Sequence, residues 1–277
     1  MISTHNLHSL HVSEQAVNCP SSPWQKANGL RKVKAHRGAS GRAPENSRRA
    51  VSLAFERGAD AVEIDVRITS DEQVVVFHDA DTNRVGSRDR LVRDQSLAQL
   101  RELDIGQWKG AEYIGERITT LSELLTIIPA EKTVFVEIKD GSSSVPLVLH
   151  ELDNCRSSCS IAIESFDEEV LKAVRDQNHA LALHRTVGLE KESGAIVPFA
   201  TLLATQARRS GLTGLCVDHR GITLEFAEAV RAEGLQLAAW TVNTIEELDS
   251  LLGMPITWVE SDFPETIVRA LARFSDN

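Results

Sequence analysis

The chain is poor in several features that would place a protein in a particular class. Only 4 of its 277 residues are cysteine, which is too few for the disulfide framework of a small secreted domain. We therefore expect free thiols at Cys19, Cys155, Cys159 and Cys216. No apolar run approaches the roughly 20 residues of a membrane-spanning helix, so we expect no integral membrane segment. The N-terminal stretch also lacks the cationic start and apolar stretch of a secretory signal, and we expect a cytoplasmic protein.

An excess of positive charge is absent as well. The sequence has 30 Lys and Arg residues against 40 Asp and Glu residues, a formal net charge of −10. Proteins that bind nucleic acids cluster Lys and Arg against the phosphate backbone, so no nucleic acid is expected as a partner. A small phosphodiester stays open as a substrate, because a few local cations and a metal ion can outweigh the field of the whole protein.

Residues 1–30 are polar and show no sustained hydrophobic period, so they predict an N-terminal extension outside the core. His5, His8 and His11 recur every three residues and could bind a metal ion if this stretch were helical. A partly ordered tail is the favoured interpretation. No break in composition interrupts residues 31–277, which we expect to form a single barrel domain.

From Arg31 onward, short apolar runs alternate with longer amphipathic segments. Eight of the runs indicate buried strands: Val33–His36, Ala61–Ile68, Thr133–Ile138, Ser160–Glu164, Ala180–His184, Gly214–Asp218, Leu235–Val242 and Ile256–Glu260. Helical segments between them include Asn46–Arg57, Leu121–Ile128, Glu168–Asn178, Leu224–Glu233 and Thr244–Leu252, with Asn46 and Thr244 as plausible N-caps. Repeated strand–helix units with short links predict a parallel sheet covered by helices.

A ninth apolar run, Val74–Phe77, follows the second strand after only a short turn. Parallel neighbours need a crossover of a dozen or more residues, so this pair should be an antiparallel hairpin. The eight remaining strands are the number that closes a (β/α)8 barrel. The sequence therefore predicts an α/β protein with a single TIM-type barrel, an extra β-hairpin and an insertion, roughly residues 80–120, after the second strand.

Polar residues suited to one kind of chemistry fall at or near the strand ends: His36, Arg37, Glu63, Asp65, His78, Glu137 and Lys139. In such a barrel these ends converge on one mouth, and residues two apart on a strand point the same way. Three converging carboxylates repel one another unless a cation lies between them. Oxygen ligands suit Mg²⁺ or Ca²⁺ better than zinc, so we expect a divalent metal cofactor of that kind.

Two histidines complete this set. His36 and His78 are the side chains best suited to move protons near neutral pH, while Arg37 and Lys139 could hold phosphoryl oxygens. The combination suits metal-assisted attack on a small-molecule phosphodiester. For three other residues the sequence allows two interpretations each. Glu45 and Asn46 could open a helix or contact the site, and Trp240, a candidate substrate contact, could instead pack in the core. His184 and His219 are interpreted as structural.

Several motifs together resemble the glycerophosphodiester phosphodiesterase family. They are His36-Arg37-Gly38-Ala39-Ser40-Gly41, Ala43-Pro44-Glu45-Asn46, Glu63-Ile64-Asp65-Val66, Val76-Phe77-His78-Asp79, Val136-Glu137-Ile138-Lys139, Ser165-Phe166-Asp167 and Trp240-Thr241-Val242-Asn243, in the family's order. The resemblance implies a TIM-type barrel and metal-dependent hydrolysis of a glycerophosphodiester to an alcohol and sn-glycerol 3-phosphate. By position it implies metal ligands at Glu63, Asp65 and Glu137, a catalytic pair at His36 and His78, and phosphate contacts at Arg37 and Lys139.

The chain also departs from the family pattern. Arg42 is unusually large and basic, Ser47-Arg48-Arg49 makes a helix start basic, and Val259-Glu260-Ser261-Asp262 replaces an apolar-Thr-Asp ending. We expect Glu260 to add a carboxylate at the mouth of the last strand. The departures leave the alcohol portion of the substrate open. The alternatives are a sugar phosphodiester, a sphingomyelinase D or phospholipase D-like activity on sphingomyelin or lysophospholipid, and a non-catalytic binding barrel.

Overall fold

The computed structural model describes residues 31–275, apart from 156–157 and 189–195. The expectations for residues 1–30, including the histidine-rich extension and the thiol of Cys19, lie outside the described residues. Cys155, Cys159 and Cys216 are free, as predicted.

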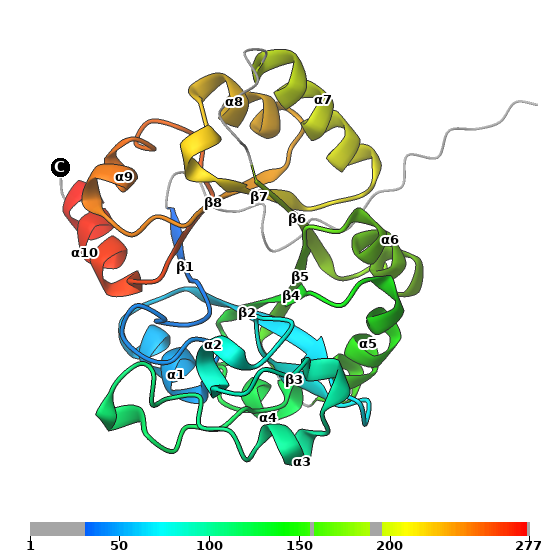
Figure 1. The fold of residues 1–277 in the computed structure, drawn as a ribbon. Coiled ribbons are helices and arrows are strands. Elements are labelled where there is room, and N and C mark those ends of the chain that lie inside the picture. Colours follow the sequence, from blue (N-terminus) through cyan, green and yellow to red (C-terminus); the bar gives the residue numbers. More distant parts are fainter. Residues whose placement is uncertain (1–30, 156–157, 189–195, 276–277) are drawn as a thin grey trace, which may run out of the picture. The chain divides into compact units, whose positions relative to one another are not determined.

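Eight parallel strands close into a barrel (Figure 1). They are β1 (Lys32–Ala35), β2 (Ala61–Ile68), β4 (Thr133–Ile138), β5 (Ser160–Ser165), β6 (Ala182–Val187), β7 (Gly214–Asp218), β8 (Gln236–Trp240) and β9 (Trp258–Ser261). The first strand pairs with both β9 and β2, so no sheet edge is left on the barrel. The predicted TIM-type barrel is confirmed.

The predicted hairpin is confirmed too. Strand β3 (Val74–Val76) runs antiparallel to β2, with Val76 opposite Val66. The insertion then follows with short helices α2 (Asn83–Gly86), η2 (Val92–Asp94), α3 (Leu97–Leu100) and η3 (Ala111–Tyr113). A separate cluster of buried apolar side chains, including Phe77, Val85 and Leu100, holds the insertion together. The excursion is therefore a packed element of its own.

Helices surround the barrel (Figure 1). They are α1 (Arg48–Glu56), α4 (Leu121–Leu125), α5 (Val145–Asn154), α6 (Glu168–Gln177), α7 (Ile196–Arg209), α8 (Leu224–Ala232), α9 (Ile245–Asp249) and α10 (Pro264–Ser275), with 3₁₀ turns η4 (Ser142–Ser144) and η5 (His219–Gly221). Thr244 caps α9 as predicted. The predicted cap at Asn46 is wrong, because Ser47 accepts the bond from the Ala50 amide and Asn46 is left for another role.

Inside the barrel the side chains change from aromatic to charged along the strands. Phe135 packs edge-on against Trp258 and His184, with ring centroids 5.1 and 5.2 Å away. Two residues further along β4 and β9 stand Glu137 and Glu260, and both are buried. Apolar and aromatic side chains therefore pack directly below the buried carboxylates and exclude water from that side.

Candidate functional site

Three acids meet at the mouth of the barrel. Glu63 and Asp65 come from β2 and Glu137 from β4, and Asp65 lies opposite Glu137 in the strand register. They offer ligand atoms that all lie within 4.8 Å of one another. Burial and the charges of Asp65, Glu260 and Glu137 raise the pKa of Glu63 well above its usual value. Such a cluster is stable as carboxylates only beside positive charge.

Two cationic side chains supply part of that charge. Lys139 Nζ lies 3.0 Å from Asp65 Oδ1 and 2.6 Å from Glu137 Oε1. Arg37 Nε lies 3.3 Å from Asp65 Oδ2. The main chain of Arg37 has a φ of 54°, and its amide donates to Glu63 Oε2 at 2.9 Å. Arg37 thus approaches the acids with both its backbone and its side chain.

Glycine is required immediately after this turn. Gly38 has a φ of 77°, and a Cβ built there would lie 2.6 Å from the Ala50 carbonyl carbon. Any other residue would push the loop away from α1. Close packing of the loop on the helix therefore fixes the Arg37 amide that points at Glu63.

Glu45 and Asn46, whose role the sequence left open, both lie in the site. Asn46 Nδ2 donates to Asp65 Oδ2 at 2.7 Å, and the Asp65 amide donates to Asn46 Oδ1 at 3.0 Å. Glu45 Oε1 accepts from Arg37 Nη1 at 2.9 Å. Asn46 therefore holds both the backbone and the carboxylate of Asp65, and Glu45 holds the guanidinium.

His36 is oriented by a carboxylate from the other end of the chain. Its Nδ1 lies 2.7 Å from Asp262 Oδ1, and Asp262 also accepts bonds from Ser40 Oγ and Asn243 Nδ2 at 2.8 Å. Burial opposes a charged imidazole, but the bond to Asp262 raises the pKa of His36. Sequence reasoning did not name Asp262 as a partner. The only signal was its position directly after the strand that closes the barrel beside β1.

His78 is oriented by its own neighbour. Its Nδ1 lies 2.7 Å from Asp79 Oδ1, and Arg84 of the insertion lies 2.6 Å from Asp79 Oδ2. The Phe77 amide donates to the Asp65 carbonyl, which brings His78 to the level of the acids. Burial lowers the pKa of His78. Relative to a free imidazole, His36 therefore binds a proton more tightly and His78 binds one less tightly.

An aromatic pair stands beside Lys139. Trp240 ends β8 and meets Phe166 edge-on, with ring centroids 5.8 Å apart. Lys139 Nζ lies 5.7 Å from the centre of the Phe166 ring. Trp240 is only half-buried, and its buried Nε1 has no hydrogen-bond partner within the described chain. The aromatic pair therefore lines one side of the mouth, and Phe166 was not predicted as part of it.

Glu260 lies at the base of the mouth, where it offers a ligand atom within 4.8 Å of those of His36 and Glu63. It points into the barrel, where Lys34 Nζ lies 2.8 Å from Glu260 Oε2 and 2.6 Å from Glu164 Oε1. Lys34 is fully buried, and an ammonium group there requires carboxylate partners. Glu260 lies opposite Lys34 in the register of β1 and β9, which brings the two side chains together.

The other two histidines lie apart from this set. His184 is buried in the barrel, and burial lowers its pKa to about 3, so it is a neutral packing residue. His219 lies on η5, with Nε2 3.9 Å from Glu247 Oε1. The seven other candidate polar residues come together at one mouth of the barrel: His36, Arg37, Glu63, Asp65, His78, Glu137 and Lys139.

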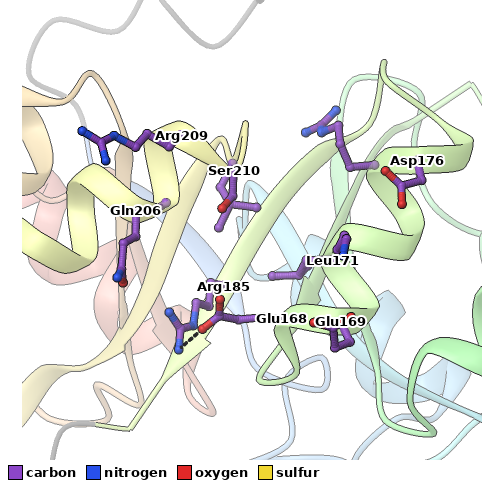
Figure 2. Close-up of a pocket in the computed structure, with 12 residues that line it drawn as sticks. Glu168, Glu169, Leu171, Asp176, Arg185, Gln206, Arg209 and Ser210 are labelled. Atoms are coloured by element: carbon purple, nitrogen blue, oxygen red, sulfur yellow. Dashed lines mark ion pairs between the residues drawn. The ribbon is translucent and has the colours of Figure 1, made fainter.

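A cleft elsewhere on the surface lacks the acids, histidines and cations of the candidate site. Figure 2 shows the cleft between α6 and α7, about 270 Å³ in volume, where Arg185 pairs with Glu168 at 2.6 Å. None of the candidate catalytic residues lines it. Within the part of the chain that the structure describes, no helix has the length and apolar character needed to cross a membrane.

Comparison with known proteins shows the family of this chain. The sequence model of the glycerophosphoryl diester phosphodiesterase family matches residues 36–266. A glycerophosphodiester phosphodiesterase of Caldanaerobacter subterraneus subsp. tengcongensis is 30% identical over 246 residues, which cover 87% of this chain and 98% of the relative. A putative glycerophosphodiester phosphodiesterase of Bacillus subtilis is 30% identical over 240 residues, which cover 85% and 96%.

Solved structures give the same result. A phosphodiesterase of Oleispira antarctica, determined in complex with the product sn-glycerol-3-phosphate, superposes with a TM-score of 0.80 at 27% identity. The match covers 88% of this chain and 97% of that one. The chain belongs to the glycerophosphoryl diester phosphodiesterase family and is a phosphoric diester hydrolase.

Proposed function

We propose that the protein hydrolyses a glycerophosphodiester to an alcohol and sn-glycerol 3-phosphate, with one divalent cation held by Glu63, Asp65 and Glu137. The observation that carries the proposal is the convergence of these three buried acids with Lys139 and Arg37 at one mouth. The product bound to the Oleispira relative supports the choice of substrate class.

The residues present fit such an ion. Glu63 Oε1 is buried and has no hydrogen-bond partner among the described residues, so it is available to a cation. Five buried carboxylates, at Glu63, Asp65, Glu137, Glu164 and Glu260, face three cationic side chains, at Lys34, Arg37 and Lys139. The acids therefore outnumber the cationic side chains around them. Because all three proposed ligands are oxygens, Mg²⁺ or Ca²⁺ is favoured.

The bound ion would act as a Lewis acid on a phosphoryl oxygen and as a template for the attacking hydroxyl. Arg37 and Lys139 would bind the remaining phosphoryl oxygens, the first with its planar guanidinium and the second as a point charge. Asn46 and Glu45 keep Asp65 and Arg37 in place while the substrate binds. Trp240 and Phe166 would contact the substrate beside Lys139.

His36 and His78 would move the protons. One removes a proton from the nucleophile, and the other donates one to the departing alkoxide. The position of His78 beside the insertion favours it as the acid, since the insertion would cover the alcohol. The raised pKa of His36 and the lowered pKa of His78 favour the opposite assignment. Substrates with different leaving groups separate the two, as described in the Discussion.

The test of the proposed function is product analysis on a panel of phosphodiesters, with and without chelator. We expect release of sn-glycerol 3-phosphate from glycerophosphocholine, glycerophosphoethanolamine or a glycerophospho-sugar, and loss of this activity when the chelator removes the metal. Sphingomyelin and lysophosphatidylcholine belong in the same panel as the alternative substrates. Hydrolysis of those two alone, or full activity in excess chelator, would refute the proposal.

A further inference from the structure

Four arginines line a cleft on the flank of the barrel, outside the mouth. Arg42, Arg49, Arg57 and Arg269 form it together with Tyr113 and Glu265, and its volume is about 460 Å³. The cleft lies between α1 and α10, which are neighbours around the barrel (Figure 1). Arg49, Leu53 and Arg57 are spaced four residues apart and so lie along one face of α1, with Arg57 at its C-cap. The volume lies in the range of small-molecule sites.

Most of this positive charge is not neutralised by the protein. Arg42 Nε pairs with Glu265 Oε1 at 2.7 Å, and Arg269 Nε donates only to the Glu265 carbonyl, at 3.1 Å. Within the described residues, Arg49, Arg57 and Arg269 make no ion pair with a carboxylate. Glu116 of the insertion is a further acid near Arg49, whose charge partly offsets the rise in the pKa of Glu116 that burial causes. An excess of cations remains in a chain whose net charge is −10.

The contrast with the cleft of Figure 2 shows why this matters. There the guanidinium of Arg185 is paired with Glu168, and acidic and basic residues both line the wall. In the α1–α10 cleft four guanidinium groups face one carboxylate. All four arginines are exposed, so their guanidinium groups are open to an anion from solution. Guanidinium groups bind phosphate oxygens in pairs of parallel hydrogen bonds.

We propose that the α1–α10 cleft binds a phosphate-bearing anion, at a site separate from the reaction at the mouth. This use accounts for two of the departures from the family pattern, Arg42 and Arg49. The cleft also borders the machinery of the mouth. The Arg42 carbonyl accepts from Tyr113 Oη of the insertion at 2.8 Å, and Ser40, two residues earlier, bonds to Asp262 beside His36.

Calorimetric titration with inorganic phosphate in low-salt buffer tests the proposal. The protein is first treated with chelator, so that an ion at the mouth contributes nothing to the binding. The wild type should bind phosphate, and R49Q/R57Q should weaken the affinity by at least about tenfold, the effect of losing charge-assisted hydrogen bonds. The matched control R208Q/R231Q removes two exposed arginines elsewhere and should bind like the wild type. R49K/R57K keeps the charge and should lose less affinity than R49Q/R57Q.

A second arm distinguishes the source of the phosphate. Co-sedimentation with phosphatidylcholine vesicles containing phosphatidic acid should depend on Arg49 and Arg57 if the ligand is a lipid headgroup, and the vesicles should not bind if it is a free phosphate. The proposal is overturned if the wild type binds neither probe, or if correctly folded R49Q/R57Q binds both as the wild type does. Hydrolysis by metal-loaded R49Q/R57Q is measured separately, so the fate of the cleft does not decide the proposed function.

Discussion

Two clusters of acids in the barrel have similar ligand geometry, and they are connected by Glu260, which also lies within 4.8 Å of ligand atoms of His36 and Glu63. In the interior, Glu164, Cys216 and Glu260 offer ligand atoms within 4.8 Å of one another, as Glu63, Asp65 and Glu137 do at the mouth. Each cluster has a lysine between two carboxylates. The interior lysine, Lys34, is fully buried and makes its cluster complete, because neither Glu164 nor Glu260 has a buried oxygen without a partner among the described residues.

The cluster at the mouth is incomplete. It has a third acid, Glu63, with a buried oxygen that no described residue contacts by a hydrogen bond. Its lysine, Lys139, is 14% exposed and can turn toward a ligand. Similar ligand geometry therefore gives two results: an ion pair in the interior whose charged groups are all partnered, and a cluster at the mouth that would bind a divalent cation under the proposed function.

The largest expected effect on turnover comes from neutralising one acid of the cluster at the mouth. Asp65→Asn keeps the shape and removes one charge, so turnover should fall on the order of 10³-fold, the scale of metal-ion stabilisation of phosphoryl charge. Steady-state kinetics at saturating metal measures it. The exposed Asp71→Asn serves as the matched control and should retain wild-type activity. Wild-type turnover in Asp65→Asn would mean that catalysis does not depend on this carboxylate.

The two histidines are separated by the quality of the leaving group. The general acid matters most for an alkoxide and little for a nitrophenolate, which departs without a proton. Either His36→Ala or His78→Ala should lose about 10²–10⁴-fold on glycerophosphocholine and be rescued on a glycerophospho-nitrophenol. The rescued position is the acid, and the other variant should stay impaired on both substrates. Equal losses on both substrates would withdraw the acid–base assignment.

The interior cluster of Lys34, Glu164 and Glu260 should contribute to the free energy of unfolding. Lys34→Met leaves two buried carboxylates without their cation, which should destabilise the fold by about 3–5 kcal/mol. Urea unfolding measures this, with the exposed Lys172→Met as a control that should change little. Adding Glu164→Gln and Glu260→Gln to Lys34→Met should restore part of the loss. A Lys34→Met protein as stable as the wild type would contradict the structural role of the interior cluster.

The smallest effect is expected on substrate choice. Trp108 of the insertion lines a small pocket with His78 and Arg84, beside the place expected for the alcohol. Trp108→Ala, or replacement of residues 80–120 by a short linker, should change the ranking of glycerophosphodiesters by about tenfold, the scale of apolar pocket contacts. Relative kcat/KM values across the panel measure it. An unchanged ranking would remove the insertion from substrate selection.

Local patterns in the sequence predicted most of the fold and the acids. Hydrophobic periodicity identified the eight strands, and the short turn before Val74 identified the hairpin. Same-face spacing brought Glu63 and Asp65 together. These features depend only on residues close in sequence, and barrel geometry supplies the rest.

Long-range contacts were not predictable in the same way. Asp262 is 226 residues from His36, and their bond depends on how the last strand meets the first. Asn46 and Ser47 are both good capping residues, so only the packing of the loop decided which one caps α1. Glu260 was expected at the mouth, but its pairing with the buried Lys34 depends on how the last strand meets the first and was not predicted. The same limits concealed the arginine cleft, whose members come from distant segments.

The most direct test of the central claim is cation binding to the chelator-stripped protein, measured by calorimetric titration with Mg²⁺ and Ca²⁺. Two matched amide variants, Asp65→Asn at the mouth and Glu164→Gln in the interior, compare the two clusters. We predict one cation per chain for the wild type and for Glu164→Gln, and binding weakened beyond detection in Asp65→Asn. Wild-type affinity in Asp65→Asn, or loss of the cation in Glu164→Gln alone, would contradict the assignment of the metal to the mouth.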